Sequence, residues 1–311
     1  MNSRIQRKKN KGSLKKMFKM IILFFCLILI GTAGYAFYLY DSVKETAGEM
    51  HEPLSDPSEK PSIKGSGKGP ISILLMGVDE RPGDRGRSDT MIVITVNPNE
   101  DSMYMFNIPR DTRTEIIGKN KQDKINHAYA FGGTEMAVKT VENFLDIPIH
   151  YYIKVNMESF KDIVNAVGGV NVNNKFAFNQ NGFNFNKGEL HLNGDKALAY
   201  SRMRKRDPKG DLGRNARQQQ VIKAVINEGA KVSSITKFDN VLDVLSENVR
   251  TNMTFKEMKS IQANYKNARK DINSFEVQGQ GQRINSIYYY IVSEQERNKL
   301  SNKLKEHLEI S

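Results

Sequence analysis

The sequence predicts an α/β domain with helices packed on a central sheet, and two patterns lead to this fold class. Short runs rich in Ile, Val, Leu, Phe and Met, each bounded by Gly, Asp, Asn or Pro, are typical of buried strands. Between and after them, apolar residues recur at the three- and four-residue spacing of helices. Because strand and helix patterns alternate along the chain, a layered α/β arrangement is expected.

The expected elements follow in chain order. Strands are predicted over 71–76, 91–96, 102–108, 151–155 and 275–278. Helices are predicted from Thr134 onward and over 157–167, 195–202, 213–230 and 294–308. Four phenylalanines at alternate positions in an Asn-rich stretch, Phe176, Phe178, Phe183 and Phe185, predict a hairpin with one apolar face. That face is either ordinary core or the wall of a lipid-accepting cavity.

The N-terminus predicts a membrane anchor. Residues 1–19 form a basic tail with eight Lys or Arg and no acid, and removing these eight from the formal net charge of +12 leaves +4. Residues 20–40 carry no charge, and at about 1.5 Å per residue they match a hydrocarbon core of roughly 30 Å. Since positive charge stays in the cytoplasm, we expect a single-pass type II protein of the cell membrane with an extracytoplasmic domain. A cleaved signal peptide is the alternative, but the apolar run is longer than such peptides use.

The rest of the chain is predicted to be a linker over 41–69 and one domain over 70–311. The linker is polar and rich in Pro and Gly, so we expect it to remain an unpacked tether. Cys26, the single cysteine, lies inside the predicted span, which excludes a disulfide-linked partner and thiol chemistry in the exported part. The five histidines form no zinc motif. No recognition helix is apparent, so no nucleic-acid partner is expected.

Two aspartates point to a divalent cation. Asp79 ends the first predicted strand and Asp89 begins the second, which brings their carboxylates together at one sheet edge. Mg²⁺, or Mn²⁺, binds a few carboxylates and completes its shell with water and phosphate oxygens. The alternative is a loop held by salt bridges to neighbouring arginines.

Arginines supply the second part of the candidate site. Arg110 follows the third strand, where loops of layered sheets form binding sites, although a surface turn explains it as well. Further along lie Arg202, Arg204, Arg214, Arg217 and Gln218. The last three fall in the first turns of a helix, where cations are unfavourable without a negative partner. A phosphate clamp of guanidinium forks is the functional interpretation, and a solvated basic face is the alternative.

Two further features have a structural and a functional interpretation. Val221, Ile222 and Val225 continue the helix with an apolar stripe, which suits a lipid tail but also ordinary core packing. His127 precedes a helix and resembles a general base. Capping or packing by Asn126 and His127 is the favoured interpretation, because the sequence identifies no acidic partner.

The order of these motifs resembles one known family. The motifs are Gly77-Val-Asp79-x-Arg81, Arg87-Ser-Asp89-Thr-Met91, Ile108-Pro-Arg110-Asp111-Thr112, Lys124-Ile-Asn126-His-Ala-Tyr129, Leu192-Asn-Gly194-x-x-Ala197-Leu-x-Tyr200-x-Arg202-x-Arg204 and Asp211-x-x-Arg214-x-x-Arg217-Gln218. Together they resemble the LytR-CpsA-Psr domain, with the motifs spread over about residues 70–230. The resemblance implies a three-layer α/β/α domain with a central mixed sheet and a hydrophobic pocket for a polyprenyl pyrophosphate.

The resemblance also implies an activity and residue roles. Members transfer an anionic glycopolymer from undecaprenyl pyrophosphate to peptidoglycan, so the implied partners are these two substrates and membrane lipid. Wall teichoic acid is the expected polymer, and the C6 hydroxyl of N-acetylmuramic acid the expected acceptor. Carried over by motif, Asp79 and Asp89 would hold Mg²⁺. The phosphate-binding residues would be Arg81, Arg110, Arg202, Arg204, Arg214, Arg217 and Gln218, and the catalytic set Asp79, Asp89, Arg110, Arg202 and Arg214.

Other functions remain open at this point. The chain could bind a polyprenyl pyrophosphate without turnover, act as a regulatory attenuator, or hydrolyse a lipid pyrophosphate. Within the transferase hypothesis, Asp111 and Asp211 are the candidates to accept the proton of the acceptor hydroxyl.

Overall fold

The computed structural model describes residues 32–55, 68–80, 83–157, 159–229 and 235–310. Within these residues no helix is both long enough and apolar enough to cross a membrane. Most of the predicted span at 20–40 lies outside the described ranges, as do residues 56–67 of the predicted linker. The chain divides into two units, Met1–Glu45 and Thr46–Ser311, and the second contains the α/β domain.

The segment after residue 40 differs from the predicted tether. Residues 32–50 are helical, and Thr46 and Ala47 are buried. The chain then pairs with β11 (Val249–Thr251), where Glu52 N donates to Thr251 O at 2.8 Å. The prediction was based on the Pro- and Gly-rich composition of the whole segment. These packed residues lie before its first proline, Pro53, so the average composition did not reveal them.

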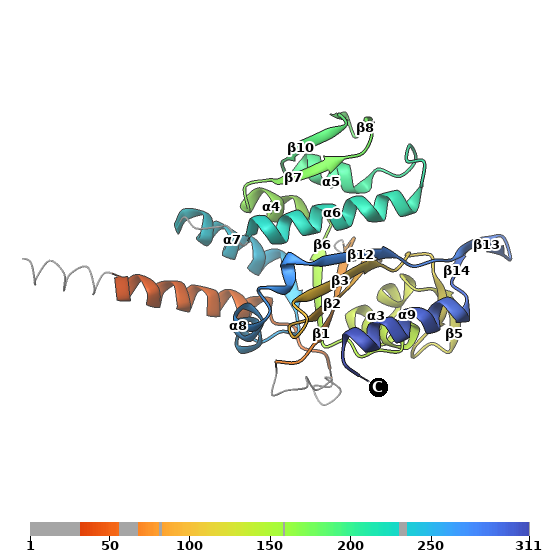
Figure 1. Ribbon diagram of the computed structural model, residues 1–311, viewed down its shortest axis with the longest axis horizontal. Coiled ribbons are helices and arrows are strands. Elements are labelled where there is room, and N and C mark those ends of the chain that lie inside the picture. The colour runs from red at the N-terminus through yellow and green to blue at the C-terminus, as the bar shows by residue number, and fades with distance from the viewer. Residues whose placement is uncertain (1–31, 56–67, 81–82, 158, 230–234, 311) are drawn as a thin grey trace, which may run out of the picture. The chain divides into compact units, whose positions relative to one another are not determined.

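A six-stranded mixed sheet forms the centre of the domain (Figure 1). Its strand order is β11-β6-β1-β2-β3-β12, with β1–β6 and β3–β12 parallel and the other pairs antiparallel. The strands beside β11 are β6 (Tyr151–Asn156), β1 (Ile71–Val78), β2 (Ser88–Asn97), β3 (Ser102–Asn107) and β12 (Ile272–Glu276). This confirms the predicted α/β class and the central mixed sheet.

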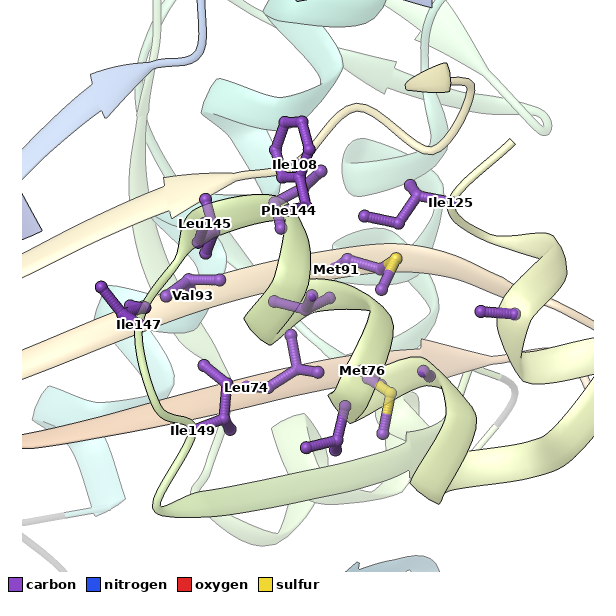
Figure 2. Close-up of a cluster of buried hydrophobic side chains, with 14 of the residues drawn as sticks. Leu74, Met76, Met91, Val93, Ile108, Ile125, Phe144, Leu145, Ile147 and Ile149 are labelled. Atoms are coloured by element: carbon purple, nitrogen blue, oxygen red, sulfur yellow. The ribbon is translucent and has the colours of Figure 1, made fainter. Parts of the chain in front are cut away.

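Side chains alternate between the two faces of the sheet, as the period of a strand requires. Leu74, Met76, Met91 and Val93 point to one face, where Figure 2 shows them meeting Phe144 and other residues around α3. That face is covered by α3 (His127–Leu145) and α9 (Glu294–His307). Two non-helical glycines kink α3 near its start, which explains why the apolar periodicity was visible only from Thr134 onward.

The opposite face carries the alternate residues of the same strands, among them Ile73, Ile92 and Ile94. It is covered by α6 (Asp211–Gly229) and α8 (Phe255–Asn264). A capping box of Thr254 and Glu257 begins α8, whose helical pattern the sequence analysis did not identify. With α3 and α9 on the first face, the domain has the three layers that the resemblance implied.

A smaller group of elements packs on α6 away from the sheet. It contains α4 (Phe160–Ala166), α5 (Gly194–Arg202), β7 (Val170–Asn174), β8 (Phe178–Gln180), β9 (Phe183–Phe185) and β10 (Gly188–Leu192). The predicted phenylalanine hairpin is confirmed as β8–β9. Phe178 and Phe185 are buried against Tyr200, so their role is core packing rather than lining a lipid cavity.

Several elements were not predicted from the sequence. They are the helix α7 (Ile235–Asn248) and the short strands β4 (Arg113–Ile116), β5 (Lys121–Lys124), β11, β13 (Gln280–Ile284) and β14 (Ile287–Ile291). Most are three to five residues long, and β5 and β13 are largely exposed. Short, exposed strands lack the apolar alternation on which the prediction depended.

Candidate functional site

Asp79 and Asp89 lie at the same edge of the sheet, as predicted. Asp79 follows β1, and Asp89 lies in β2 where the register shifts from Gly77↔Thr90 to Val78↔Ser88. This bulge leaves Asp89 without a partner residue on β1, and bulges of this kind redirect side chains beside binding sites. Gly86, at a φ of 66°, lets the loop approach closely, since a Cβ there would lie 1.9 Å from Asp79 O.

The Asp79 loop is held from beneath by α3. The buried Tyr129 hydroxyl donates a hydrogen bond to Glu80 Oε1, and Asn156 Nδ2 donates to Glu80 O at 3.2 Å. Burial and the neighbouring Glu80 carboxylate raise the pKa of Tyr129, so the phenol remains protonated and continues to donate. These bonds fix the residue next to Asp79.

Two charged pockets lie beside these aspartates. The carboxylate pocket, of about 470 Å³, is lined by Asp79, Asp84, Gly86, Arg87, Asp89, Arg110, Asp111, Lys124, Asn126, His127 and Ala130. The arginine pocket, of about 570 Å³, is lined by Pro109, Arg110, Asp111, Lys124, Arg204, Lys209, Asp211, Leu212, Tyr288 and Tyr290. Because Arg110, Asp111 and Lys124 line both, the two pockets are neighbours.

Arg110 joins the two pockets electrostatically. Its Nη1 donates to Asp89 Oδ1 at 2.9 Å, and its Nε lies 3.9 Å from Asp111 Oδ2. Burial alone lowers the pKa of Arg110, but the surrounding carboxylates, with Asp89 foremost, outweigh this and raise it. Lys124 Nζ pairs with the other oxygen of Asp111 at 2.6 Å. The guanidinium is therefore a fixed positive charge beside a predicted metal ligand.

Arg214 lies next to this cluster in the second turn of α6. Its Nη2 is 2.9 Å from Asp211 Oδ1, and Arg204 Nη1 lies 3.8 Å from the same oxygen. Burial lowers the pKa of Arg214, Asp211 opposes that shift, and the nearby Arg110 lowers it further. Arg214 Nε and, in the carboxylate pocket, Asn126 Oδ1 are buried without a hydrogen-bond partner in the described part of the chain. Orphaned polar atoms of this kind are satisfied by a ligand or water.

Arg217 is placed differently from the prediction. Its side chain is only 7% exposed and pairs with Asp207, which is 3% exposed. Nε donates to Tyr200 O at 3.1 Å, Nη2 donates to Met203 O, and the guanidinium lies over the rings of Phe178 and Tyr200. With these donors bonded to the protein, Arg217 braces the 203–210 loop and does not line either charged pocket.

Cations in the first turns of α6 were expected to need a negative partner, and Asp211 and Asp207 supply such partners from within the protein. Arg214, Arg217 and Gln218 also point in different directions. Gln218 is buried, donates to Thr90 Oγ1 at 3.0 Å and accepts from Asn107 Nδ2 at 3.0 Å, so it does not line the charged pockets.

A third, apolar cavity of about 540 Å³ opens between the sheet and α6. Its walls come from the odd-numbered residues of β1, from β2 and β6, and from α4, α6, α7 and α8; they include Ile73, Leu75, Ile94, Ile153, Phe160, Val221, Ile222, Val225, Leu245 and Ile261. The predicted apolar stripe of α6 therefore belongs both to the core and to a cavity wall. Val221 and Ile222 are buried, and Val221, Ile222 and Val225 all line the cavity.

Some polar residues in the wall of this apolar cavity are next in the chain to charged residues of the site. Thr90, Ser201 and Gln218 line the cavity, and Thr90 directly follows Asp89 while Ser201 directly precedes Arg202. The cavity wall and the charged cluster are thus linked through consecutive residues of β2 and of α5. Arg202 ends α5 and is partly buried, and Arg81 lies outside the described residues.

The structure adds residues that the sequence analysis missed. His127 Nδ1 lies 3.0 Å from Asp123 Oδ1, so His127 has an acidic partner four residues before it. Asn126 occupies the N-cap of α3 without a side-chain capping bond and is buried, so the packing alternative of the capping-or-packing prediction holds for it. Asp207, Lys124 and the tyrosines of β14 were also missed. Only the i, i+4 spacing of Asp123 and His127 could have been read from the sequence.

Comparison with known proteins assigns the chain to a family. The model of the LytR_cpsA_psr family matches residues 37–306. The chain belongs to the LytR-CpsA-Psr family. It is 51% identical over 308 residues to "Polyisoprenyl-teichoic acid--peptidoglycan teichoic acid transferase TagU" of Bacillus subtilis, covering 98% of this chain and 99% of that protein. The protein of the same name from Halalkalibacterium halodurans is 52% identical, with 96% and 100% covered.

Solved structures of LytR-CpsA-Psr proteins agree with this fold. The crystal structure of B. subtilis TagU has a TM-score of 0.65 at 51% identity and covers 78% of this chain and 99% of that one. A structure of TagT bound to LIIa-WTA has a TM-score of 0.70 at 30% identity, with 84% and 100% covered. The family resemblance predicted from the motifs is therefore confirmed.

Proposed function

We propose that this chain is a polyisoprenyl-teichoic acid–peptidoglycan teichoic acid transferase. The observation that carries the proposal is that one domain holds an apolar cavity together with neighbouring arginine and carboxylate pockets, with Thr90 of the cavity wall directly following Asp89. A polyprenyl pyrophosphate has a long apolar tail and a doubly phosphorylated head, and the two kinds of lining match these parts. The near full-length relatives named TagU support the same activity.

The transfer exchanges the phosphoanhydride bond of the pyrophosphate for a phosphate ester. The oxygen of an acceptor hydroxyl on peptidoglycan, proposed as the C6 hydroxyl of N-acetylmuramic acid, attacks the phosphorus that carries the glycopolymer. A new P–O bond forms, the bond to the second phosphate breaks, and polyprenyl phosphate leaves. Asp111 and Asp211, the carboxylates of the arginine pocket, are the candidates to receive the hydroxyl proton.

The arginines stabilise the charge that develops on the phosphates. Arg110, Arg204 and Arg214 surround Asp211 and act in a partly buried setting, where fixed positive charges are most effective. Guanidinium groups match phosphate oxygens with paired hydrogen bonds. Arg202 and Arg81 remain proposed phosphate ligands from the family motifs, and Arg217 contributes by holding the 203–210 loop that carries Arg204.

The carboxylate pocket fits a hard divalent cation. Asp79 and Asp89 line it together, and Asn126 Oδ1 is a further oxygen there. The described residues contain no group of three His, Cys, Asp or Glu arranged around one ion, so phosphate and water oxygens would complete the shell, as Mg²⁺ or Mn²⁺ prefers. A bound Mg²⁺ would neutralise charge on the pyrophosphate.

The proposed location is the cell membrane, with residues 20–40 as the spanning helix and the domain outside. Phe37, Tyr38 and Tyr40 are exposed on the helix over 32–50, which suits the aromatic belt at a membrane surface. The proposed location places the domain near the lipid-linked donor.

A reconstituted transfer reaction tests the proposal. The full chain in detergent is mixed with an undecaprenyl-pyrophosphate-linked teichoic acid precursor and uncrosslinked peptidoglycan oligomers, with and without Mg²⁺. We expect a covalent polymer–peptidoglycan product that requires Mg²⁺ and is lost in Asp79→Asn and Asp89→Asn. Binding without product would favour a lipid-binding protein, and release of phosphorylated polymer without acceptor would favour a pyrophosphatase.

A further inference from the structure

The hairpin of β13 and β14 presents two tyrosines to the arginine pocket. Its turn residues, Asn285 and Ser286, both have positive φ, as a tight two-residue hairpin requires. Alternation along β14 places Tyr288 and Tyr290 on one face, and Ile287 on the other. Both tyrosines line the arginine pocket, whereas Ile287 does not.

Glycines on the paired strand make room for these rings. A Cβ added to Gly281 would lie 2.8 Å from Tyr288 Cε2, and one added to Gly279 would lie 2.6 Å from Tyr290 Cε1. The two tyrosine rings therefore lie against the backbone of Gly279 and Gly281, where no side chain intervenes. Tyr288 keeps 43% of its surface exposed although its inner side is in contact with Gly281. The result is an open aromatic surface backed by main chain.

The hairpin is fixed to the site rather than free at the domain edge, from which it projects (Figure 1). Tyr290 N donates to Asp111 O at 2.8 Å, and Thr112 bridges to Tyr290. Tyr290 Oη donates to Val277 O at 3.0 Å, which orients its ring. The aromatic surface thus has a defined position relative to Asp111 and to its neighbour Arg110.

We propose that Tyr288 and Tyr290 form a platform that binds a pyranose ring next to the phosphate-binding arginines. One face of a pyranose carries C–H groups, whose partial positive charge and apolar surface pack on the negative face of an aromatic ring. Its hydroxyls find partners in the same pocket, since Asp111 accepts hydrogen bonds and Lys209 donates them. A lipid tail has its own cavity, and a phosphate alone would need no aromatic surface.

This inference rests on the proposed function, which supplies two sources of a pyranose. One is the sugar that carries the pyrophosphate of the donor, and the other is the glycan strand of the acceptor. Both have the same ring chemistry. Binding measurements with separate ligands distinguish them, and they also separate this inference from the transferase proposal, since binding is measured without turnover.

The experiment uses the full chain in detergent and three ligands: undecaprenyl pyrophosphate, undecaprenyl-pyrophosphate-linked disaccharide, and a lipid-free peptidoglycan oligomer. The variants are Tyr288→Ala, Tyr288→Phe, which keeps the ring, and Ile287→Ala as the matched control. Ile287 is 50% exposed on the same strand but outside the pocket. Gly281→Ala is a second test, because its Cβ would displace the Tyr288 ring without removing it.

We expect Tyr288→Ala and Gly281→Ala to weaken binding of at least one sugar-bearing ligand about tenfold, as loss of an aromatic contact implies. Both variants should bind undecaprenyl pyrophosphate with wild-type affinity. Tyr288→Phe and Ile287→Ala should bind all three ligands with wild-type affinity. Loss for the linked disaccharide assigns the platform to the donor, and loss for the oligomer assigns it to the acceptor. Unchanged binding of both sugars, or an equal loss for undecaprenyl pyrophosphate, would overturn the inference. Absence of transfer product in the wild type would refute the proposed function without affecting this result.

Discussion

Two arginines of α6, three residues apart, lie in different surroundings. Arg214 lies beside the charged pockets, with Nε unbonded and one ion pair to the partly exposed Asp211. Arg217, three residues later, is enclosed by Phe178 and Tyr200 and bonded through all three nitrogens. An arginine with an unbonded nitrogen can bind a ligand, whereas one with all three nitrogens bonded to the protein stabilises the fold. The partners distinguish these roles, and the spacing does not.

The largest expected effect is on the free energy of unfolding, at Arg217. Arg217→Ala leaves Asp207 buried and unpaired, which should lower the free energy of unfolding by about 3–5 kcal/mol. Chemical denaturation of the full chain in detergent measures this. Arg204→Ala is the control, because its exposed pair with Asp211 should contribute at most about 1 kcal/mol. Equal losses in the two variants would remove the distinction between the structural Arg217 and an arginine that lines the arginine pocket.

The next largest effect is on the rate of transfer, at Arg214. Arg214→Ala should lower the rate of transfer about 100-fold or more, because it removes a preorganised positive charge from the phosphates. Single-turnover transfer with saturating donor measures the effect, and denaturation verifies that the protein remains folded. Arg214→Lys should recover only part of the rate, since an ammonium lacks the paired donors of a guanidinium. A wild-type rate in Arg214→Ala would contradict the site assignment.

A smaller effect is expected further along α6, where the helix faces the apolar cavity. Val225→Trp should occupy part of the 540 Å³ and raise the KM for an undecaprenyl donor about tenfold, with kcat unchanged. A donor with a short, water-soluble prenyl chain is the control and should be unaffected. If both donors respond alike, the cavity does not hold the tail.

The smallest expected effect is the contribution of His307 to the pH dependence of stability. His307 on α9 is buried on the other face of the sheet, with Nδ1 2.8 Å from Thr95 Oγ1 and Nε2 2.8 Å from Ser102 Oγ. Burial lowers the pKa of His307, so the unfolded chain takes up the proton first as the pH falls. Stability contributed by the neutral ring is therefore full above about pH 6.5 and lost below it.

Thermal unfolding measures this loss as a fall in the unfolding temperature between pH 7 and pH 5. His307→Gln, which cannot titrate, should show a smaller slope over the same range. If its slope equals that of the wild type, other groups cause the pH dependence.

Regular elements and their order were predictable because apolar periodicity reports burial directly. The strands β1, β2, β3 and β6 begin or end within three residues of their predicted bounds. Asp79 and Asp89 were predictable as neighbours because consecutive antiparallel strands bring such residues to one edge. Arg217 could not be assigned, because its partners lie on the 203–210 loop and on α5, whose packing no local pattern reveals.

The β14 tyrosines were missed for a related reason. Tyr288 and Tyr290 reach the arginine pocket only through the pairing of a C-terminal hairpin with Thr112, a contact across most of the domain sequence. The apolar stripe of α6 was ambiguous from sequence because a cavity wall and a core surface need the same residues.

A structure of the chain with a bound undecaprenyl pyrophosphate would test the central claim most directly. We predict the prenyl chain between the sheet and α6, in the cavity lined by Ile73 and Val225, with the phosphates within hydrogen-bond distance of Arg110 and Arg214. A prenyl chain bound elsewhere, with this cavity empty and the phosphates away from both arginines, would contradict the account.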